Sequence, residues 1–281
     1  MRFEDFARDH GLIIDSVVPF RWVATPTVDH PRKKNGRYKF MGDHGFVQNW
    51  ATMQKVAVWK ADKGFHFSPE LQRQRVEVNQ QRQKDADRAA VKAQKILDEA
   101  VNAPHPYLTK KGFPDEASKV WTIHDSKHPE PVRLLVIPMR RDGNLVGVQL
   151  INEEGVKKFL YGQISKGATF NMGAKGITIL CEGYATALSI KAAMNAIKLP
   201  YSIRVCFSAS NMEEVARGIP DCVIVADNDP NGVGERAARN TGKPYWISPT
   251  IGEDFNDFHL RAGLFQSALS LKKVLQSRLR G

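Results

Sequence analysis

Five acidic residues in the second half of the sequence follow apolar runs that are typical of β-strands. Glu182 ends the stretch ITILCE, and Asp227 and Asp229 follow the later run CVIVA. Asp254 and Asp257 lie beyond a further run, YWIS, in the sequence GEDFNDFH. Because Mg²⁺ and Mn²⁺ prefer carboxylate oxygens, we expect Glu182, Asp227 and Asp229 to form a divalent-metal site, and Asp254 and Asp257 form a third acidic cluster.

The elements that must position these residues alternate between strand and helix patterns. From residue 176 to residue 259 the order is strand, helix, strand, helix, strand, helix, strand and an acidic loop, which predicts a parallel α/β sheet. The carboxyl ends of parallel strands line one ligand crevice, so Glu182 is predicted to meet Asp227 and Asp229 there. Residues 260–281 predict a basic amphipathic helix that could dock on its own domain or on a partner, and we favour its own domain.

The first 175 residues have a different organisation. Residues 1–67 predict a small β-rich unit that begins with a short helix, and residues 68–102 predict a long polar connector helix. Residues 103–175 alternate and break at Asp142-Gly143 and Glu154-Gly155, which predicts an antiparallel meander. Glycines between residues 162 and 176 are expected to let the backbone approach a ligand. The predicted domains are 1–67, 68–102, 103–175, 176–259 and 260–281.

The composition is that of an ordinary globular protein, with 42% hydrophobic and 25% charged residues in 281. No run approaches the roughly 18 apolar residues that a membrane span needs, and the N-terminus has no leader-like apolar core. We therefore expect no membrane partner and an intracellular location. The three cysteines form no CxxC pair, which argues against a zinc ribbon or a disulfide framework.

The charge is distributed unevenly along the chain. The net charge is +11, yet residues 176–259 contain 10 acidic and 7 basic residues and are the only net-negative part. A basic surface attracts phosphate backbones, so this distribution predicts a metal site beside a nucleic-acid surface. The predicted contacts to nucleic acid or nucleotide phosphates are Arg133, Lys157, Lys158, Lys166, Lys175, Lys33 and Lys34.

Aromatic and basic residues are interleaved in the first 67 residues. The aromatic residues there include Trp22, Tyr38, Phe40, Phe46, Trp50 and Trp59. Single-stranded nucleic acid is bound by this combination of stacking and phosphate contacts. A small β unit also needs aromatic residues for its own core, so both interpretations stay open.

The acidic motifs, in this order and at strand ends, resemble the Toprim domain of primases, topoisomerases and some nucleases. The series HPYLTKKGF, VIPMRRDGNLVGVQLIN, KKFLYGQISKGATFNMG, CEGYATALSI, ADNDPNGVGERAA and EDFNDF is similar to the core of primases from bacteriophages and mobile plasmids. This resemblance covers about residues 104–260. It implies a Toprim, Rossmann-like parallel sheet, a preceding mixed α/β primase-core subdomain and a small β-rich N-terminal unit. One departure is Glu253, where the family often has a basic residue.

The resemblance also implies a function. It implies a DNA primase, which is a DNA-directed RNA polymerase that uses Mg²⁺ or Mn²⁺. The implied partners are ribonucleoside triphosphates, a single-stranded DNA template and, as a candidate, a separate helicase. The implied location is a bacterial cytoplasm. The resemblance implies that Glu182, Asp227 and Asp229 are the catalytic residues, with Glu182 acting as a metal ligand or as a general base. It implies that Asp254 and Asp257 are further metal ligands. The alternatives are a Toprim nuclease and a non-catalytic single-stranded DNA-binding relative. A topoisomerase is disfavoured because 281 residues leave no room for its gate domain.

Overall fold

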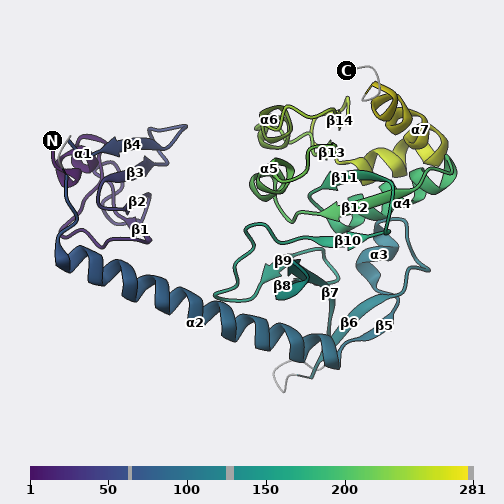
Figure 1. The fold of residues 1–281 in the computed structure, drawn as a ribbon, viewed down its shortest axis with the longest axis horizontal. Coiled ribbons are helices and arrows are strands. Elements are labelled where there is room, and N and C mark those ends of the chain that lie inside the picture. Colours follow the sequence, from purple (N-terminus) through teal and green to yellow (C-terminus); the bar gives the residue numbers. More distant parts are fainter. Residues whose placement is uncertain (63–64, 125–129, 278–281) are drawn as a thin grey trace. The chain divides into compact units, whose positions relative to one another are not determined.

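The computed structural model describes residues 1–62, 65–124 and 130–277 and divides the chain into two compact units, Met1–Lys84 and Asp85–Gly281 (Figure 1). The boundary between the units falls inside one long helix, α2 (Pro69–Glu99). Each unit has its own buried apolar clusters. The units are described separately below.

The N-terminal unit is a four-stranded antiparallel sheet with one short helix on one face. Its elements are α1 (Phe3–Asp9), β1 (Trp22–Thr25), β2 (Gly36–Phe40), β3 (His44–Asn49) and β4 (Ala57–Lys60). The strands lie in the order β1-β2-β3-β4. Phe3 and Ala7 of α1 are buried against Tyr38, Val47 and Trp59, which alternate along their strands and therefore share one face. The small β-rich N-terminal unit is thus confirmed.

The long polar helix is confirmed as α2. Ser68 begins it, because its hydroxyl oxygen accepts a hydrogen bond from the backbone N–H of Leu71 at 3.2 Å. Only Ala89, Ala93 and Ile96 of this helix are buried among the described residues, and all three lie in its C-terminal half. This half packs within the second unit, whereas most of the remaining helix surface is polar.

An antiparallel sheet opens the second unit. Its strands are β5 (Val101–Ala103), β6 (Ser118–Ile123), β7 (Val132–Arg141), β8 (Asn144–Ile151) and β9 (Lys157–Phe159), in that spatial order, and α3 (Pro106–Lys110) lies between β5 and β6 in the chain. Asp142 and Gly143 both have positive φ and form the predicted hairpin turn between β7 and β8. The two faces of this sheet bury different side chains: Leu135 packs towards α3, and Val136 packs towards α2.

A mostly parallel sheet completes the second unit. Its spatial order is β10-β12-β11-β13-β14, and only β10 runs antiparallel to its neighbour. The elements are β10 (Phe170–Met172), β11 (Ile177–Cys181), α4 (Tyr184–Ala196), β12 (Tyr201–Val205), α5 (Ala209–Arg217), β13 (Cys222–Ala226), α6 (Val233–Asn240), β14 (Tyr245–Ile247) and α7 (Phe255–Ser277). The predicted alternation of strands and helices is confirmed.

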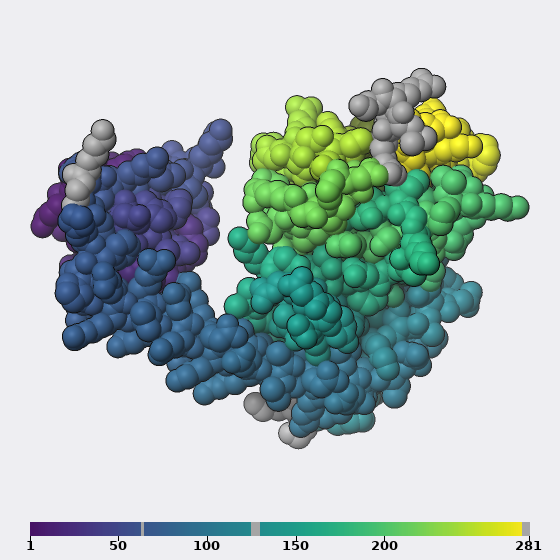
Figure 2. Space-filling view, in the orientation of Figure 1, coloured from purple at the N-terminus to yellow at the C-terminus, as the bar shows by residue number. Residues whose placement is uncertain are grey.

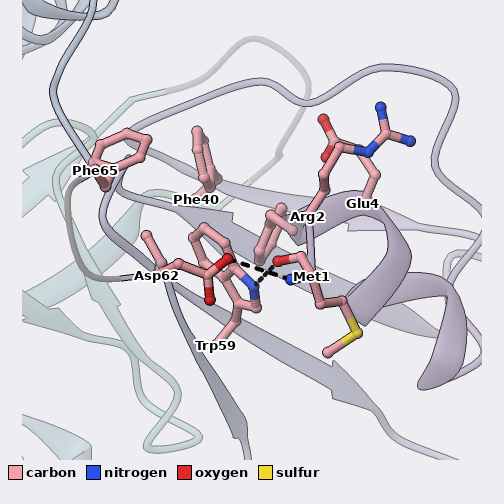
Figure 3. A pocket seen from close by; sticks show the side chains of 9 residues that line it. Met1, Arg2, Glu4, Phe40, Trp59, Asp62 and Phe65 are labelled. Atoms are coloured by element: carbon pink, nitrogen blue, oxygen red, sulfur yellow. Dashed lines mark hydrogen bonds and ion pairs between the residues drawn. The ribbon is translucent and has the colours of Figure 1, made fainter.

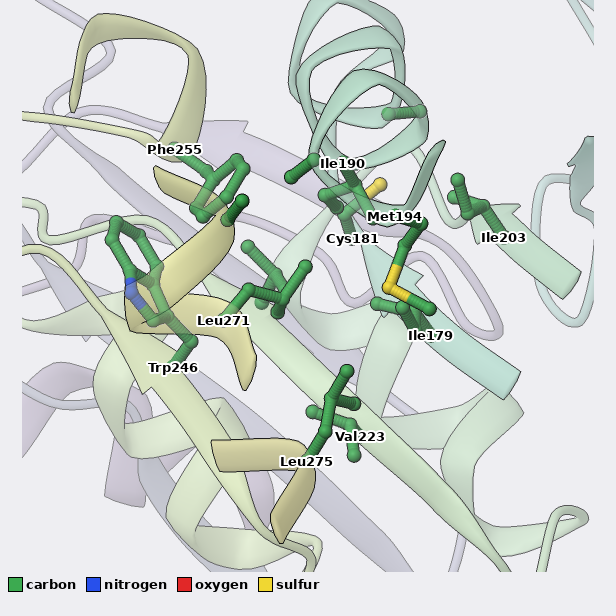
Figure 4. Close-up of a cluster of buried hydrophobic side chains, with 14 of the residues drawn as sticks. Ile179, Cys181, Ile190, Met194, Ile203, Val223, Trp246, Phe255, Leu271 and Leu275 are labelled. Carbon is green, nitrogen blue, oxygen red and sulfur yellow. The ribbon is translucent and has the colours of Figure 1, made fainter. Parts of the chain in front are cut away.

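Helices cover both faces of the parallel sheet. On one face, Ile179 and Val223 pack against α4 and α7, together with Trp246 and Phe255 (Figure 4). On the other face, Leu180 and Ile224 pack against α5 and α6. Burial of each large apolar side chain contributes about 1.5–3 kcal/mol, so this three-layer core holds the strand ends firmly. Figure 2 shows one surface of the second unit, on which the side chains of the teal, green and yellow segments lie against one another.

The C-terminal helix differs from its prediction at its start. The predicted acidic loop ends at Asp254, because α7 already begins at Phe255 and includes Asp257. Gly263 interrupts the helix with φ 81° and ψ 165°, so two helical segments meet there. Beyond this kink, Leu271 and Leu275 are buried in the core, which confirms docking on the chain's own domain.

Three of the glycines between residues 162 and 176, Gly162, Gly173 and Gly176, come close to the chain's own backbone, and the expected approach to a ligand stays a prediction. Gly176 has φ 114°, and a Cβ atom there would collide with the carbonyl of Pro200. The close backbone approach at Gly176 is to the chain itself, where β11 enters the sheet beside β12. The three cysteines, Cys181, Cys206 and Cys222, are buried and free. Among the described residues, none of the helices has the length and apolar character needed to cross a membrane.

Candidate metal-binding active site

Glu182 and Asp227 follow two adjacent parallel strands. β11 and β13 pair with Cys181 opposite Val225, so the residues directly after them leave the sheet at the same edge. The chain runs from β11 outward to β12, returns to β13 on the other side, and continues to β14. The gap between β11 and β13 is therefore the switch point of the sheet, where ligands of open α/β folds bind.

Glu182 and Asp227 are half-buried, and each has one buried carboxylate oxygen without a hydrogen-bond partner. These oxygens are Oε1 of Glu182 and Oδ1 of Asp227. Burial, with the nearby charge of Asp229, raises the pKa of Glu182 to about 7. Burial, with the charges of Glu182, Asp254 and Asp229, raises the pKa of Asp227 to about 8. The structure thus brings four of the five predicted carboxylates within electrostatic reach of one another.

A tight loop carries Asp227 and Asp229. Gly234 at the start of α6 touches the carbonyl of Asp227 so closely that a Cβ atom would not fit. The N–H of Gly234 also donates to Oδ2 of Asp229 at 3.3 Å. Asn228 between the two acids binds the loop after β14, because its N–H donates to the carbonyl of Glu253 at 3.1 Å. These contacts hold both acidic side chains next to the loop that leads to Asp254.

Asp254 and Asp257 have a structural task that the sequence interpretation missed. The N–H of Asp257 donates to Oδ1 of Asp254 at 2.8 Å, and the N–H of Asp254 donates to Oδ2 of Asp257 at 3.3 Å. Asp257 also forms an ion pair with Lys111 at 3.1 Å. Both oxygens of Asp257 are therefore engaged, whereas the charge of Asp254 reaches Asp227. The pattern DFND is a capping box at the start of α7, and it could have been recognised in the sequence.

Two positive groups face the acidic cluster. Lys157 of β9 lowers the pKa of both Glu182 and Asp227, and its Nζ lies 3.7 Å from the Cβ position of Gly183. The N–H of Ala209, at the N-terminus of α5, also favours the charged form of Glu182. The end of a helix presents free N–H groups, so this end of α5 attracts negative charge to the same edge.

The remaining predicted basic residues lie elsewhere. Arg133 donates to the carbonyl of Pro104 at 2.7 Å, and Lys166 forms an ion pair with Glu214 at 3.1 Å. Lys158 follows Lys157 in β9, so its side chain points to the opposite face of that strand. Lys175 is exposed before β11, and Lys33 and Lys34 are exposed in the N-terminal unit. Their role in binding phosphate stays a prediction.

Glu253 departs from the expected family pattern, and neighbouring side chains engage its carboxylate. Its carboxylate accepts hydrogen bonds from Arg261 at 2.6 and 2.9 Å and from the hydroxyl of Ser248 at 2.8 Å. The Arg261 hydrogen bonds hold the pKa of Glu253 at about 2. Arg261 thereby places a positive charge beside the last acidic motif from a position eight residues further along the chain.

The acidic cluster fits a divalent cation by its chemistry. Two buried carboxylate oxygens without partners, crowded by two further carboxylates, favour binding of positive charge. In the described part of the chain, no three His, Cys, Asp or Glu side chains already have the arrangement of a metal site. Asp257 is already engaged, because its oxygens are bound to Lys111 and the α7 N-terminus. The ligand assignment for all five acids stays a prediction.

A separate hollow of about 500 Å³ lies in the N-terminal unit beside α1 (Figure 3). Trp59 donates through Nε1 to the carbonyl of Met1 at 3.0 Å, and the amino group of Met1 pairs with Asp62 at 3.5 Å. None of the predicted site residues lines this hollow. Its lining is largely the edge of the apolar core of that unit.

The parallel sheet, its switch point and the acidic strand ends define an open α/β fold, and a protein-family model matches this part of the chain. Residues 177–264 match the Toprim domain. The predicted resemblance is therefore confirmed for this segment, and the chain contains a Toprim domain preceded by an antiparallel subdomain. The search of curated proteins gives no match.

Two solved structures are similar to the chain, each at 14% sequence identity. One, with a TM-score of 0.42, contains the bacteriophage T7 lagging-strand DNA polymerase interacting with primase domains of two gp4 subunits bound to an RNA/DNA hybrid and dTTP; the similarity covers 62% of this chain and 91% of that chain. The other is the primase fragment of the bacteriophage T7 primase-helicase protein, with a TM-score of 0.38 and coverage of 62% and 68%.

Proposed function

We propose that this protein is a DNA primase that joins ribonucleotides on a single-stranded DNA template. One observation carries the proposal: Glu182 and Asp227 lie half-buried after adjacent strands at the switch point of a Toprim sheet, and Oε1 and Oδ1 are buried without partners. Such a site concentrates negative charge in a protein whose net charge is +11. Nucleotidyl transfer needs this combination of an acidic centre and a phosphate-binding surround.

The acidic residues and Lys157 have different roles in the proposed reaction. Asp227, Asp229 and Asp254 would hold Mg²⁺ or Mn²⁺, which when bound neutralises charge on the reacting phosphate. Glu182, with a pKa raised to about 7, can accept a proton near neutral pH and acts as a base towards the attacking 3′-hydroxyl or as a further ligand. Lys157 faces the same cluster and is positioned to bind a nucleotide phosphate.

Asp257 has a different place in this scheme. Its contacts with Lys111 and with the start of α7 fix the turn that presents Asp254. We therefore assign Asp254 to the metal and Asp257 chiefly to holding Asp254 in place. Arg133, Lys158, Lys166, Lys175, Lys33 and Lys34 remain candidates for the surrounding phosphate contacts.

Primer synthesis tests the proposal directly. Full-length protein is incubated with a panel of single-stranded DNA templates, labelled ribonucleoside triphosphates and Mg²⁺ or Mn²⁺. A primase gives short template-dependent RNA products, and Asp227→Asn gives none. Cleavage of the template without RNA synthesis would instead establish a Toprim nuclease, and binding without turnover would establish a non-catalytic relative. A separate helicase partner is tested by adding a replicative helicase to the same reaction.

A further inference from the structure

The exposed face of the N-terminal sheet gathers aromatic and basic side chains. β1 to β4 pair in register, so Trp22, Lys39, Phe46 and Val58 form one row across all four strands. Neighbouring rows on the same face contain Arg37 with Gln48, and His44 with Lys60. No carboxylate occurs among the strand residues of this face, because its members are Trp22, Ala24, Arg37, Lys39, His44, Phe46, Gln48, Val58 and Lys60.

The aromatic residues of this face are not needed for the core. The opposite face of the sheet buries Tyr38 and Trp59 against α1, at 2% and 7% exposure. Trp22 and Trp50 are instead 44% and 47% exposed. The structure thus separates the aromatic residues of this unit into a core set and a surface set, which the sequence pattern could not do.

The surface aromatic rings lie close together. The rings of Trp22 and Phe46 are 6.1 Å apart, and His44 lies 5.5 Å from Phe46 at 89°. Such a contiguous exposed group marks a binding surface, whereas single exposed apolar residues are common on any protein. A run of rings at this spacing can accept successive bases, because every base has a flat face that stacks.

Arg37 is fixed between two of these rings. Its guanidinium carbon lies 4.5 Å from the ring of Trp22 and 5.7 Å from that of Trp50. The side-chain oxygen of Gln48 accepts from its Nε and Nη2 at 3.1 and 2.9 Å. These two bonds use two of the five N–H groups of an arginine, so donors remain for a phosphate. Lys39 and Lys60 add positive charge to the same face.

We propose that this face, defined by Trp22, Arg37, Phe46 and Trp50, binds single-stranded DNA by stacking bases on its rings and holding phosphates with its basic residues. We infer a single strand as the occupant because the basic residues complement its phosphate charge and the rings can stack on its bases. A duplex has no exposed base faces that could stack on these rings. The identification of the bound strand as a template rests on the proposed function, but the binding itself does not.

The test measures binding by the full-length protein without any catalysis. Fluorescence anisotropy with a labelled oligothymidylate of about 12 nucleotides, in EDTA, gives the Kd of wild type, Trp22→Ala, Trp50→Ala and the double variant. We expect each single change to weaken binding by about tenfold, with more in the double variant, and Trp22→Phe to retain most of the affinity. Trp22→Ala should also remove part of the tryptophan fluorescence quenching that accompanies stacking.

Two comparisons make the result specific. Tyr161→Ala removes an aromatic side chain that is 89% exposed in the second unit, and it should leave Kd unchanged. The pair Lys33→Ala and Lys34→Ala should lower the salt dependence of binding with a smaller loss of affinity than the tryptophan pair. Because both tryptophans are about half exposed, thermal melting should show all variants folded.

The outcomes separate this proposal from the proposed function. The proposal is overturned if the folded double tryptophan variant binds single-stranded DNA with a Kd within about twofold of wild type, or if the lysine pair lowers the affinity more than the tryptophan pair does. It is also overturned if the wild type binds duplex DNA as tightly as single-stranded DNA and the tryptophan changes weaken both equally. Loss of binding in the tryptophan variants supports it even where wild-type protein makes no primers. Conversely, the double variant could still make primers and bind template with unchanged affinity. This result would support the metal site and would rule out this face as the DNA-binding surface.

Discussion

Asp254 and Asp257 cap the N-terminus of α7 reciprocally, each side chain accepting the backbone N–H of the other at 2.8 and 3.3 Å. The two acids therefore do different things although the sequence presents them as one motif. Asp254 adds its charge to Asp227, whereas Asp257 pairs with Lys111. The last acidic motif of the site is thus also the start of a helix.

Replacing these two acids should separate capping from catalysis. Asp254→Ser keeps a good N-cap, so the free energy of unfolding should change by less than about 0.5 kcal/mol while nucleotide incorporation falls at least about tenfold. Asp257→Ala removes one half of the capping box and the contact to Lys111, and should cost about 1 kcal/mol of stability. Chemical denaturation and primer synthesis measure the two effects. Full activity in Asp254→Ser would remove this residue from the metal ligands.

The stability of the protein without metal should fall as pH rises. Glu182 and Asp227 have pKa values of about 7 and 8 in the fold, above their ordinary values of 4.5 and 3.8, so the folded state holds more protons than the unfolded state between about pH 4 and pH 8. Within this window each group lowers the free energy of unfolding by at most ~1.4 kcal/mol per pH unit. Urea denaturation in EDTA at pH 5 and pH 8 measures the difference.

Two additions sharpen this experiment. Asp227→Asn should reduce the fall in the free energy of unfolding between pH 5 and pH 8, because the variant lacks one carboxyl group with a raised pKa. Mg²⁺ or Mn²⁺ should stabilise the wild type most at pH 8, where the carboxylates are ionised, and the variant less. An equal decline in wild type and variant would mean that Asp227 does not carry the raised pKa.

Glu182→Gln keeps the size of the side chain and removes its charge. We expect turnover to fall by roughly 10² or more, since a general base or metal ligand is lost. The melting temperature in EDTA should stay the same or rise, because one carboxylate leaves a crowded cluster. Single-turnover primer extension over a pH series measures the effect. Wild-type extension by this variant would make Glu182 a structural carboxylate.

Lys157 and Lys158 offer a matched pair in one strand. Lys157 lowers the pKa of Glu182 and Asp227, whereas the side chain of Lys158 points to the other face of β9. Lys157→Ala should weaken nucleotide use by about tenfold and raise the pKa of both carboxyl groups further. Lys158→Ala removes the same charge from the protein and should have a smaller effect. Equal effects on the KM for nucleotide would show that only overall charge matters.

Much of the Toprim domain could be predicted from the sequence by itself. Apolar runs of strand length that alternate with helical periodicity specify a parallel α/β sheet, and the acids after two of these runs must share its carboxyl edge. Glu182 and Asp227 therefore could be paired before any coordinates were known. The hairpin at Asp142-Gly143 was equally readable, because two positive φ angles in a turn favour these residue types.

Only the tertiary structure decided which side chains face each other. Strand alternation places Trp22 on one face of the N-terminal sheet and Tyr38 on the other, but the side that α1 covers depends on contacts between distant residues. Likewise, the engagement of Asp257 with Lys111 joins positions 146 residues apart. Burial and electrostatic coupling, which raise the pKa of Asp227 and separate its role from that of Asp257, are properties of packed neighbours and have no local sequence pattern.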